Sequence, residues 1–66
     1  MENKYNNQEK QNFIEWLNRF LKEEYKTERF YNGAWQEAID ANENGMSYEL
    51  PSMYAIGNRP YTYKIS

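Results

Sequence analysis

The fold is decided by the stretch Phe13-Ile14-Glu15-Trp16-Leu17-Asn18-Arg19-Phe20-Leu21. On a period of 3.6 residues its large apolar side chains fall on one broad face, and its charged and amide side chains fall on the other. This pattern predicts an amphipathic helix over Gln8–Tyr25 that buries its apolar face. Glu24 would interrupt the apolar stripe, so the core contact is expected to end near Tyr25 or the helix to break near Thr27, a residue type that caps helix N-termini.

A second amphipathic pattern follows, with an apolar face made of Phe30, Tyr31, Ala34, Trp35, Ala38 and Ile39. We expect this helix to begin between Glu28 and Ala34. It is expected to end near Asn44, because Gly45 can accept a positive φ at the end of a helix. Two positions remain open for Gly33: it belongs to the start of this helix, or it lies inside a longer helix at a cost of about 1 kcal/mol relative to Ala.

Beyond Gly45 the chain consists of short, Tyr-rich pieces separated by Pro and Gly. Met53–Ile56 and Tyr61–Ile65 predict the strands of a β-hairpin with a four-residue loop, and Ser47–Leu50 predicts a short extended segment. A lone hairpin is marginally stable in water, so it is expected to pack on the helices. The sequence therefore predicts an α+β fold: two packed helices, a long N-terminal amphipathic one and a second acidic one, followed by a small C-terminal β-hairpin.

Length and composition predict a single small domain over residues 1–66, with residues 1–7 frayed because they are polar and aperiodic. A chain of this length buries only about 60% of the surface that its unfolded form exposes. Without Cys or His it has no disulfides and almost no set of structural zinc ligands. Aromatic residues, 18% of the chain, must supply the buried area instead.

Composition also argues against several classes of function. The Ser and Thr hydroxyls have no His to act as a base, and there is no Cys nucleophile. The three glycines are isolated, which is not the pattern of a phosphate-binding loop. We therefore expect no enzyme activity, no cofactor, no metal and no small-molecule substrate. There is no apolar run of membrane-spanning length and no signal-peptide pattern, so we expect no membrane contact and a cytoplasmic location, in the host cytoplasm if a phage encodes the protein.

The segment 34–50 contains four acidic residues and no Lys or Arg. Glu49 is one of them. The other three, Glu37, Asp40 and Glu43, recur at i, i+3 and i+6, a spacing that sets neighbouring Cβ atoms about 5–6 Å apart on a helix. These three form either a solvated helix surface or a row of carboxylates that competes with phosphates for a basic groove. Duplex DNA carries one charge per about 1.7 Å, whereas this chain has a net charge of only −2. Local insertion into an Arg- or Lys-lined groove is therefore favoured over full DNA mimicry.

The rival binding surface is the predicted hairpin loop, with Tyr54, Arg59 and Tyr61. So small a core cannot hold every Tyr ring, so some Tyr side chains should be exposed. Exposed Tyr near Arg59 and Lys64 either stacks on single-stranded bases or anchors a protein interface, where Tyr and Arg are enriched. With a pI of about 5.0 the chain lacks the positive charge of a nucleic-acid binder, which favours the protein interface.

These observations predict a small non-enzymatic protein-binding module. A tiny acidic chain without Cys or His, rich in residues with AT-rich codons, resembles in general type the accessory proteins with which phages and mobile elements block host machinery, anti-CRISPR-like inhibitors of defence nucleases among them. The resemblance implies a larger host partner with a basic groove. The predicted partner-binding residues are Glu37, Asp40, Glu43, Glu49, Tyr54, Arg59 and Tyr61. The alternatives are a single-stranded nucleic-acid-binding protein that uses the Tyr-rich hairpin, and a self-associating structural or regulatory protein; the oligomeric state stays open.

Overall fold

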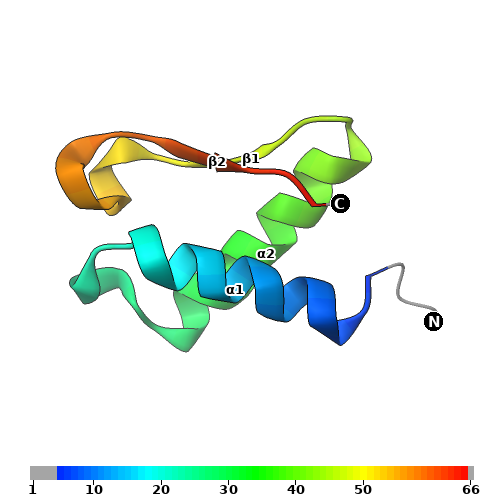
Figure 1. Cartoon of the computed structure of the whole chain (residues 1–66), viewed down its shortest axis with the longest axis horizontal. Helices are drawn as coiled ribbons and strands as arrows, with labels where there is room; N and C mark the ends of the chain where they lie inside the picture. The colour runs from blue at the N-terminus through cyan, green and yellow to red at the C-terminus, as the bar shows by residue number, and fades with distance from the viewer. Residues whose placement is uncertain (1–4, 66) are drawn as a thin grey trace.

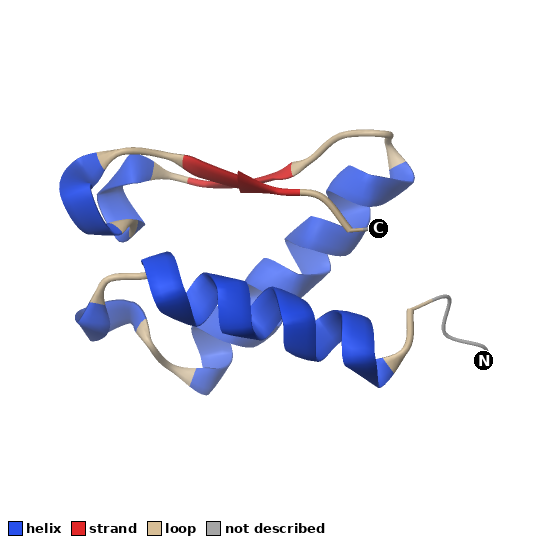
Figure 2. Ribbon diagram, viewed as in Figure 1, coloured by secondary structure: helices blue, strands red, loops and turns tan. Residues whose placement is uncertain are grey.

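In the computed structural model, which describes residues 5–65, two crossing helices are covered by a two-stranded antiparallel sheet (Figure 1). The regular elements are α1 (Asn7–Phe20), α2 (Glu28–Glu43), β1 (Tyr48–Leu50) and β2 (Tyr61–Tyr63). Three short 3₁₀ helices lie in the connections: η1 (Glu23–Tyr25), η2 (Ser52–Tyr54) and η3 (Ile56–Asn58). β1 contacts α2 and β2 contacts α1, so the sheet spans both helices (Figure 2). The predicted α+β fold, two helices followed by a hairpin, is confirmed.

α1 ends earlier than its apolar pattern suggests. The predicted helix reached Tyr25, but the observed helix stops at Phe20 because Leu21 is extended, with φ −83° and ψ 140°. Leu21 is 1% exposed and forms an antiparallel bridge with Ala55. Leaving the helix therefore brings this side chain into the core, and Tyr25 falls in η1 instead.

Tyr5, the first residue that the structure describes, is packed against α2. Tyr5 is only 9% exposed, its ring meets that of Trp35 edge to face at 5.8 Å, and its hydroxyl donates a 2.7 Å hydrogen bond to the Glu43 carboxylate. Asn6 then caps α1 by accepting a backbone N–H of the first turn at 2.8 Å. The fraying expected for residues 1–7 thus does not extend to its last three residues; the first four lie outside the described residues.

The second helix, α2, begins at Glu28, the earliest start that the sequence allowed. The Thr27 side chain accepts the backbone N–H of Phe30 at 3.1 Å, which makes Thr27 the N-cap. Gly33 therefore lies inside the helix. Asn44 is the C-cap, and Gly45 follows with a φ of +71°, which confirms the predicted glycine stop.

The pairing of the sheet differs from the prediction. β1 and β2 pair with Tyr48 opposite Tyr63 and Leu50 opposite Tyr61. The predicted first strand, Met53–Ile56, is wrong because that segment turns through η2 and η3 around the bridge at Ala55. Buried Tyr48 and Leu50 flank an exposed residue, which is the alternation that a strand requires.

Both strands of the hairpin are shorter than predicted. Pro51, which has no N–H to offer the ladder, follows β1 directly, and the chain turns into η2. The second strand ends at Tyr63 rather than continuing to Ile65 as predicted. Because β1 ends at Leu50, the connection to β2 is longer than a four-residue loop, and it turns through Gly57 and Asn58, both of which have positive φ.

One hydrophobic cluster joins all these elements. Its buried members are Tyr5, Phe13, Leu17, Leu21, Ala34, Trp35, Ala38, Tyr48, Leu50, Ala55 and Ile65. Phe13 has no exposed surface, and its ring lies between 5.1 and 5.9 Å from rings of all four regular elements: Trp16, Trp35, Tyr48 and Tyr63. Such aromatic pairs stabilise by about 0.5–1.5 kcal/mol beyond the area that they bury. Over residues 5–65, no helix has the length and apolar character that a membrane crossing requires.

Candidate functional site

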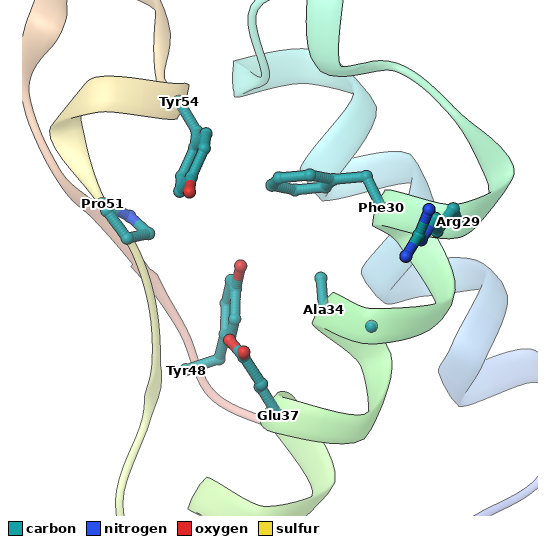
Figure 3. Close-up of a pocket in the computed structure, with 8 residues that line it drawn as sticks. Arg29, Phe30, Ala34, Glu37, Tyr48, Pro51 and Tyr54 are labelled. Carbon is teal, nitrogen blue, oxygen red and sulfur yellow. The ribbon is translucent and has the colours of Figure 1, made fainter.

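A pocket of about 270 Å³ opens between α2 on one side and β1 with η2 on the other (Figure 3). We call it the Tyr48 pocket; its lining residues are Arg29, Phe30, Gly33, Ala34, Glu37, Tyr48, Pro51 and Tyr54. Sites that enclose whole small molecules usually begin at about 300 Å³. The pocket lies close to this lower limit, so its size suits a small ligand or a few side chains of a larger partner.

Aromatic contacts hold the two walls of the pocket together. Tyr54 meets Phe30 at 5.2 Å and Tyr25 at 4.8 Å, both edge to face. The backbone carbonyl of Tyr54 also accepts the N–H of Lys22 at 2.8 Å. These contacts fix η2 against the start of α2, so the pocket is a built part of the fold.

Tyr48 is buried except at its hydroxyl. The residue is 4% exposed, and its ring packs edge to face on Phe13 and Trp16. The hydroxyl has no hydrogen bond within residues 5–65, where every buried side-chain N or O atom has a partner, so it must reach solvent. Figure 3 shows this hydroxyl pointing into the pocket. Burial, with smaller contributions from Glu37 and Tyr54, raises the pKa of Tyr48 to about 12, so at neutral pH it is an uncharged hydrogen-bond donor.

The raised pKa of Tyr48 predicts a loss of stability in alkali. An unfolded Tyr titrates near pH 10 and folded Tyr48 near pH 12, so between these values the unfolded chain releases a proton that the folded chain keeps. The contribution of this group to the free energy of unfolding should be complete below pH 10 and should fall as the pH rises toward 12. Thermal melts at about pH 8 and about pH 11 should therefore show a smaller loss for Tyr48→Phe than for the parent. Equal losses would contradict this role of Tyr48.

Opposite charges stand at the two ends of the pocket along α2. Arg29 and Glu37 are eight positions apart, which is about 12 Å along a helix. Both are exposed, and neither forms an ion pair within the described part of the chain. In Figure 3 Glu37 lies beside Tyr48, whereas Arg29 lies beyond Phe30. The pocket therefore has a negative end and a positive end that are available to a partner.

Gly33 lies on the rim between these charges, at a position that does not require glycine. It is in the interior of α2, and a Cβ added there would meet nothing within 4 Å and no strained φ. Its neighbours on the helix surface at i−4, i−3 and i+4 are Arg29, Phe30 and Glu37, all of which line the pocket. Any side chain at this position would stand at the mouth of the pocket.

The structure distributes the predicted acidic residues over different surroundings. A step of three residues along a helix is about 60° short of a full turn. Glu37 and Glu43 are two such steps apart, so their side chains point about 120° apart. Glu37 lines the pocket, Asp40 is exposed, and Glu43 accepts a hydrogen bond from Tyr5. Glu49 is exposed between two buried residues of β1, on the outer face of the sheet. These carboxylates do not form one row.

The predicted loop residues also separate. Tyr54 lines the pocket, whereas Tyr61 stacks on Phe20 with ring centroids 4.3 Å apart. The Tyr61 hydroxyl accepts a 3.4 Å hydrogen bond from Nε of Arg59, whose guanidinium carbon lies 5.9 Å from the ring centroid. Because Phe20 and Arg59 already engage this ring, it is poorly placed to stack on a nucleobase. Of the predicted binding residues, the pocket therefore contains Glu37 and Tyr54, whereas Arg59 and Tyr61 contact each other outside it.

The pocket residues that sequence reasoning did not propose for binding are Arg29, Phe30, Gly33, Ala34, Tyr48 and Pro51.

Within residues 5–65 no three Asp, Glu, His or Cys side chains are grouped so as to hold a metal ion. No protein-family model, curated protein or solved structure matches the chain.

Proposed function

We propose that the protein is a non-enzymatic binding module that captures a segment of a larger protein in the Tyr48 pocket. The observation that supports this most directly is Gly33. A glycine inside a helix costs about 1 kcal/mol relative to Ala, and neither backbone strain nor crowding requires it here. An unobstructed pocket mouth is the benefit that offsets this cost.

The chemistry of the pocket suits protein recognition. Phe30 and Pro51 offer apolar surface, the Tyr48 and Tyr54 hydroxyls are polar groups on its walls, and a charge stands at each end. Apolar area supplies affinity in such sites, and a few placed polar groups supply specificity. Tyr and Arg are also the residue types that most often dominate binding energy at protein interfaces.

The biological role that we propose is inhibition of a host protein by a phage or mobile-element product. Glu37 and exposed Asp40 lie on α2 within a segment that contains no Lys or Arg. A basic flank of the captured segment would therefore meet negative charge. If that flank belongs to a groove that binds nucleic acid, occupancy by this protein blocks the groove.

Two substitutions at Gly33 test the proposal. Gly33→Ala and Gly33→Gln should both raise the free energy of unfolding by roughly 0.5–1 kcal/mol, because both replace a helical glycine. The Gln side chain covers more of the pocket mouth than the Ala methyl does, so Gly33→Gln should weaken partner binding at least tenfold and Gly33→Ala by a smaller factor. Urea denaturation measures the first effect. Affinity purification from host lysate, then calorimetry with the purified partner, measures the second.

Arg59→Ala is the matched control on the rival surface. Arg59 is exposed and lies outside the pocket, so this variant should bind the partner as the parent does. The proposal fails if Gly33→Gln retains the parent's affinity while Arg59→Ala loses it, because the binding surface would then be the loop around Tyr61.

A further inference from the structure

We infer that the segment bound in the Tyr48 pocket is an extended, proline-containing peptide with a basic residue at the Glu37 end and an acidic residue at the Arg29 end. This inference rests on the proposed function and specifies its ligand. It follows from the shape of the pocket, its hydroxyl groups and the spacing of its charges.

Shape and polar groups favour a polyproline II segment. Phe30, Tyr48 and Tyr54 surround the pocket with aromatic surface, and docking on aromatic-lined grooves is a general mode by which proline-rich segments are recognised. A polyproline II backbone has no internal hydrogen bonds, so its carbonyl oxygens are free to accept. The Tyr48 and Tyr54 hydroxyls have no hydrogen-bond partner within residues 5–65, and they are the donors that such carbonyls require.

The spacing of the charges gives the length of the bound segment. Arg29 and Glu37 are about 12 Å apart along α2. Polyproline II rises about 3.1 Å per residue, so four residue steps also cover about 12 Å. A peptide with its two charges at i and i+4 can therefore pair with both rim residues while the residues between them occupy the pocket. A single-stranded nucleic acid fits less well, because its phosphates would face Glu37.

The test uses the peptide acetyl-Gly-Lys-Pro-Pro-Pro-Glu-Gly-amide and the full chain labelled with ¹⁵N. Titration should shift backbone amide signals of the pocket, those of Gly33 and Tyr48 among them. Peptides with Lys at both ends or Glu at both ends should bind about fivefold more weakly, which is the scale of one exposed charge pair. A peptide with Ala in place of the three prolines should bind at least as weakly.

Charge substitutions in the protein then give a switch of preference. Glu37→Lys should bind the peptide with two Glu ends most tightly, and Arg29→Glu should prefer the peptide with two Lys ends. Glu15→Lys is the matched control, since it changes the net charge as Glu37→Lys does but lies on α1 and does not line the pocket. It should keep the parent's preference for the mixed peptide.

Three outcomes overturn the inference. One is that no pocket amide shifts at millimolar peptide, and another is that Glu15→Lys changes the preference as much as Glu37→Lys does. The third is that an oligothymidylate shifts the pocket amides at lower concentration than the mixed peptide. The Gly33 variants are scored with a whole partner protein, so they decide the proposed function independently of these peptides.

Discussion

Phe13→Ala should remove a large part of the free energy of unfolding. Phe13 is fully buried and contacts an aromatic ring on each of α1, α2, β1 and β2. Truncation of a core Phe costs about 3–5 kcal/mol. A domain of this length has roughly 3–10 kcal/mol of stability in total. Circular dichroism with urea denaturation measures the loss directly.

The matched control for Phe13→Ala is Met53→Ala. Met53 is 61% exposed in η2, so its truncation should change the free energy of unfolding by no more than about 0.5 kcal/mol. Should both variants unfold at the same urea concentration, the aromatic cluster around Phe13 would not be the core of this fold.

Tyr5→Ala should lower the free energy of unfolding by about 2 kcal/mol or more. The substitution removes a ring packed edge to face on Trp35 and a hydroxyl that donates to Glu43 and accepts from the Asn42 amide. Loss of buried aromatic area and of these hydrogen bonds both contribute. Urea denaturation compares the variant with the parent.

Tyr5→Phe separates the two contributions. It keeps the ring and removes only the hydroxyl, so it should cost about 0.5–1.5 kcal/mol. An unchanged midpoint for Tyr5→Ala would mean that Tyr5 adds nothing to stability, as the expected fraying of residues 1–7 implied.

The helices were predictable because each is long enough to show its period, and short-range chemistry marks both ends of α2. The end of α1 was misplaced because Leu21 leaves the helix to bridge Ala55, which is distant in the sequence. Thr27 and Gly45 act as cap and stop through atoms a few residues away, so their roles are visible in the sequence. The strands are different. β1 has three residues, too few for an alternating pattern to stand out, and Met53–Ile56 has a composition much like that of a strand. Tyr5 was missed because a single apolar residue has no period.

The pocket was predictable only in part, because α2, β1 and η2 are separate in the sequence and only the folded chain brings them together. Glu37 and Tyr54 were proposed for binding, but on two rival surfaces rather than one. Some Tyr side chains were expected to be exposed because a small core cannot hold every ring, but nothing in the sequence showed that the Tyr48 ring is buried while its hydroxyl reaches solvent. The one local signal was Gly33, a glycine within an otherwise regular helical pattern.

The backbone hydrogen bond from Lys22 to Tyr54 and the bridge between Leu21 and Ala55 hold η2 in place from the far end of α1. One wall of the pocket therefore exists only while the whole chain is folded, and a ligand of the pocket cannot bind the unfolded chain. By mass action, a ligand at 100 times its Kd adds about 2.7 kcal/mol to the stability of such a protein. For so small a domain this is a large increment. Under the proposed function, the abundance of the partner would then govern how long each copy of the chain survives proteolysis in the cell.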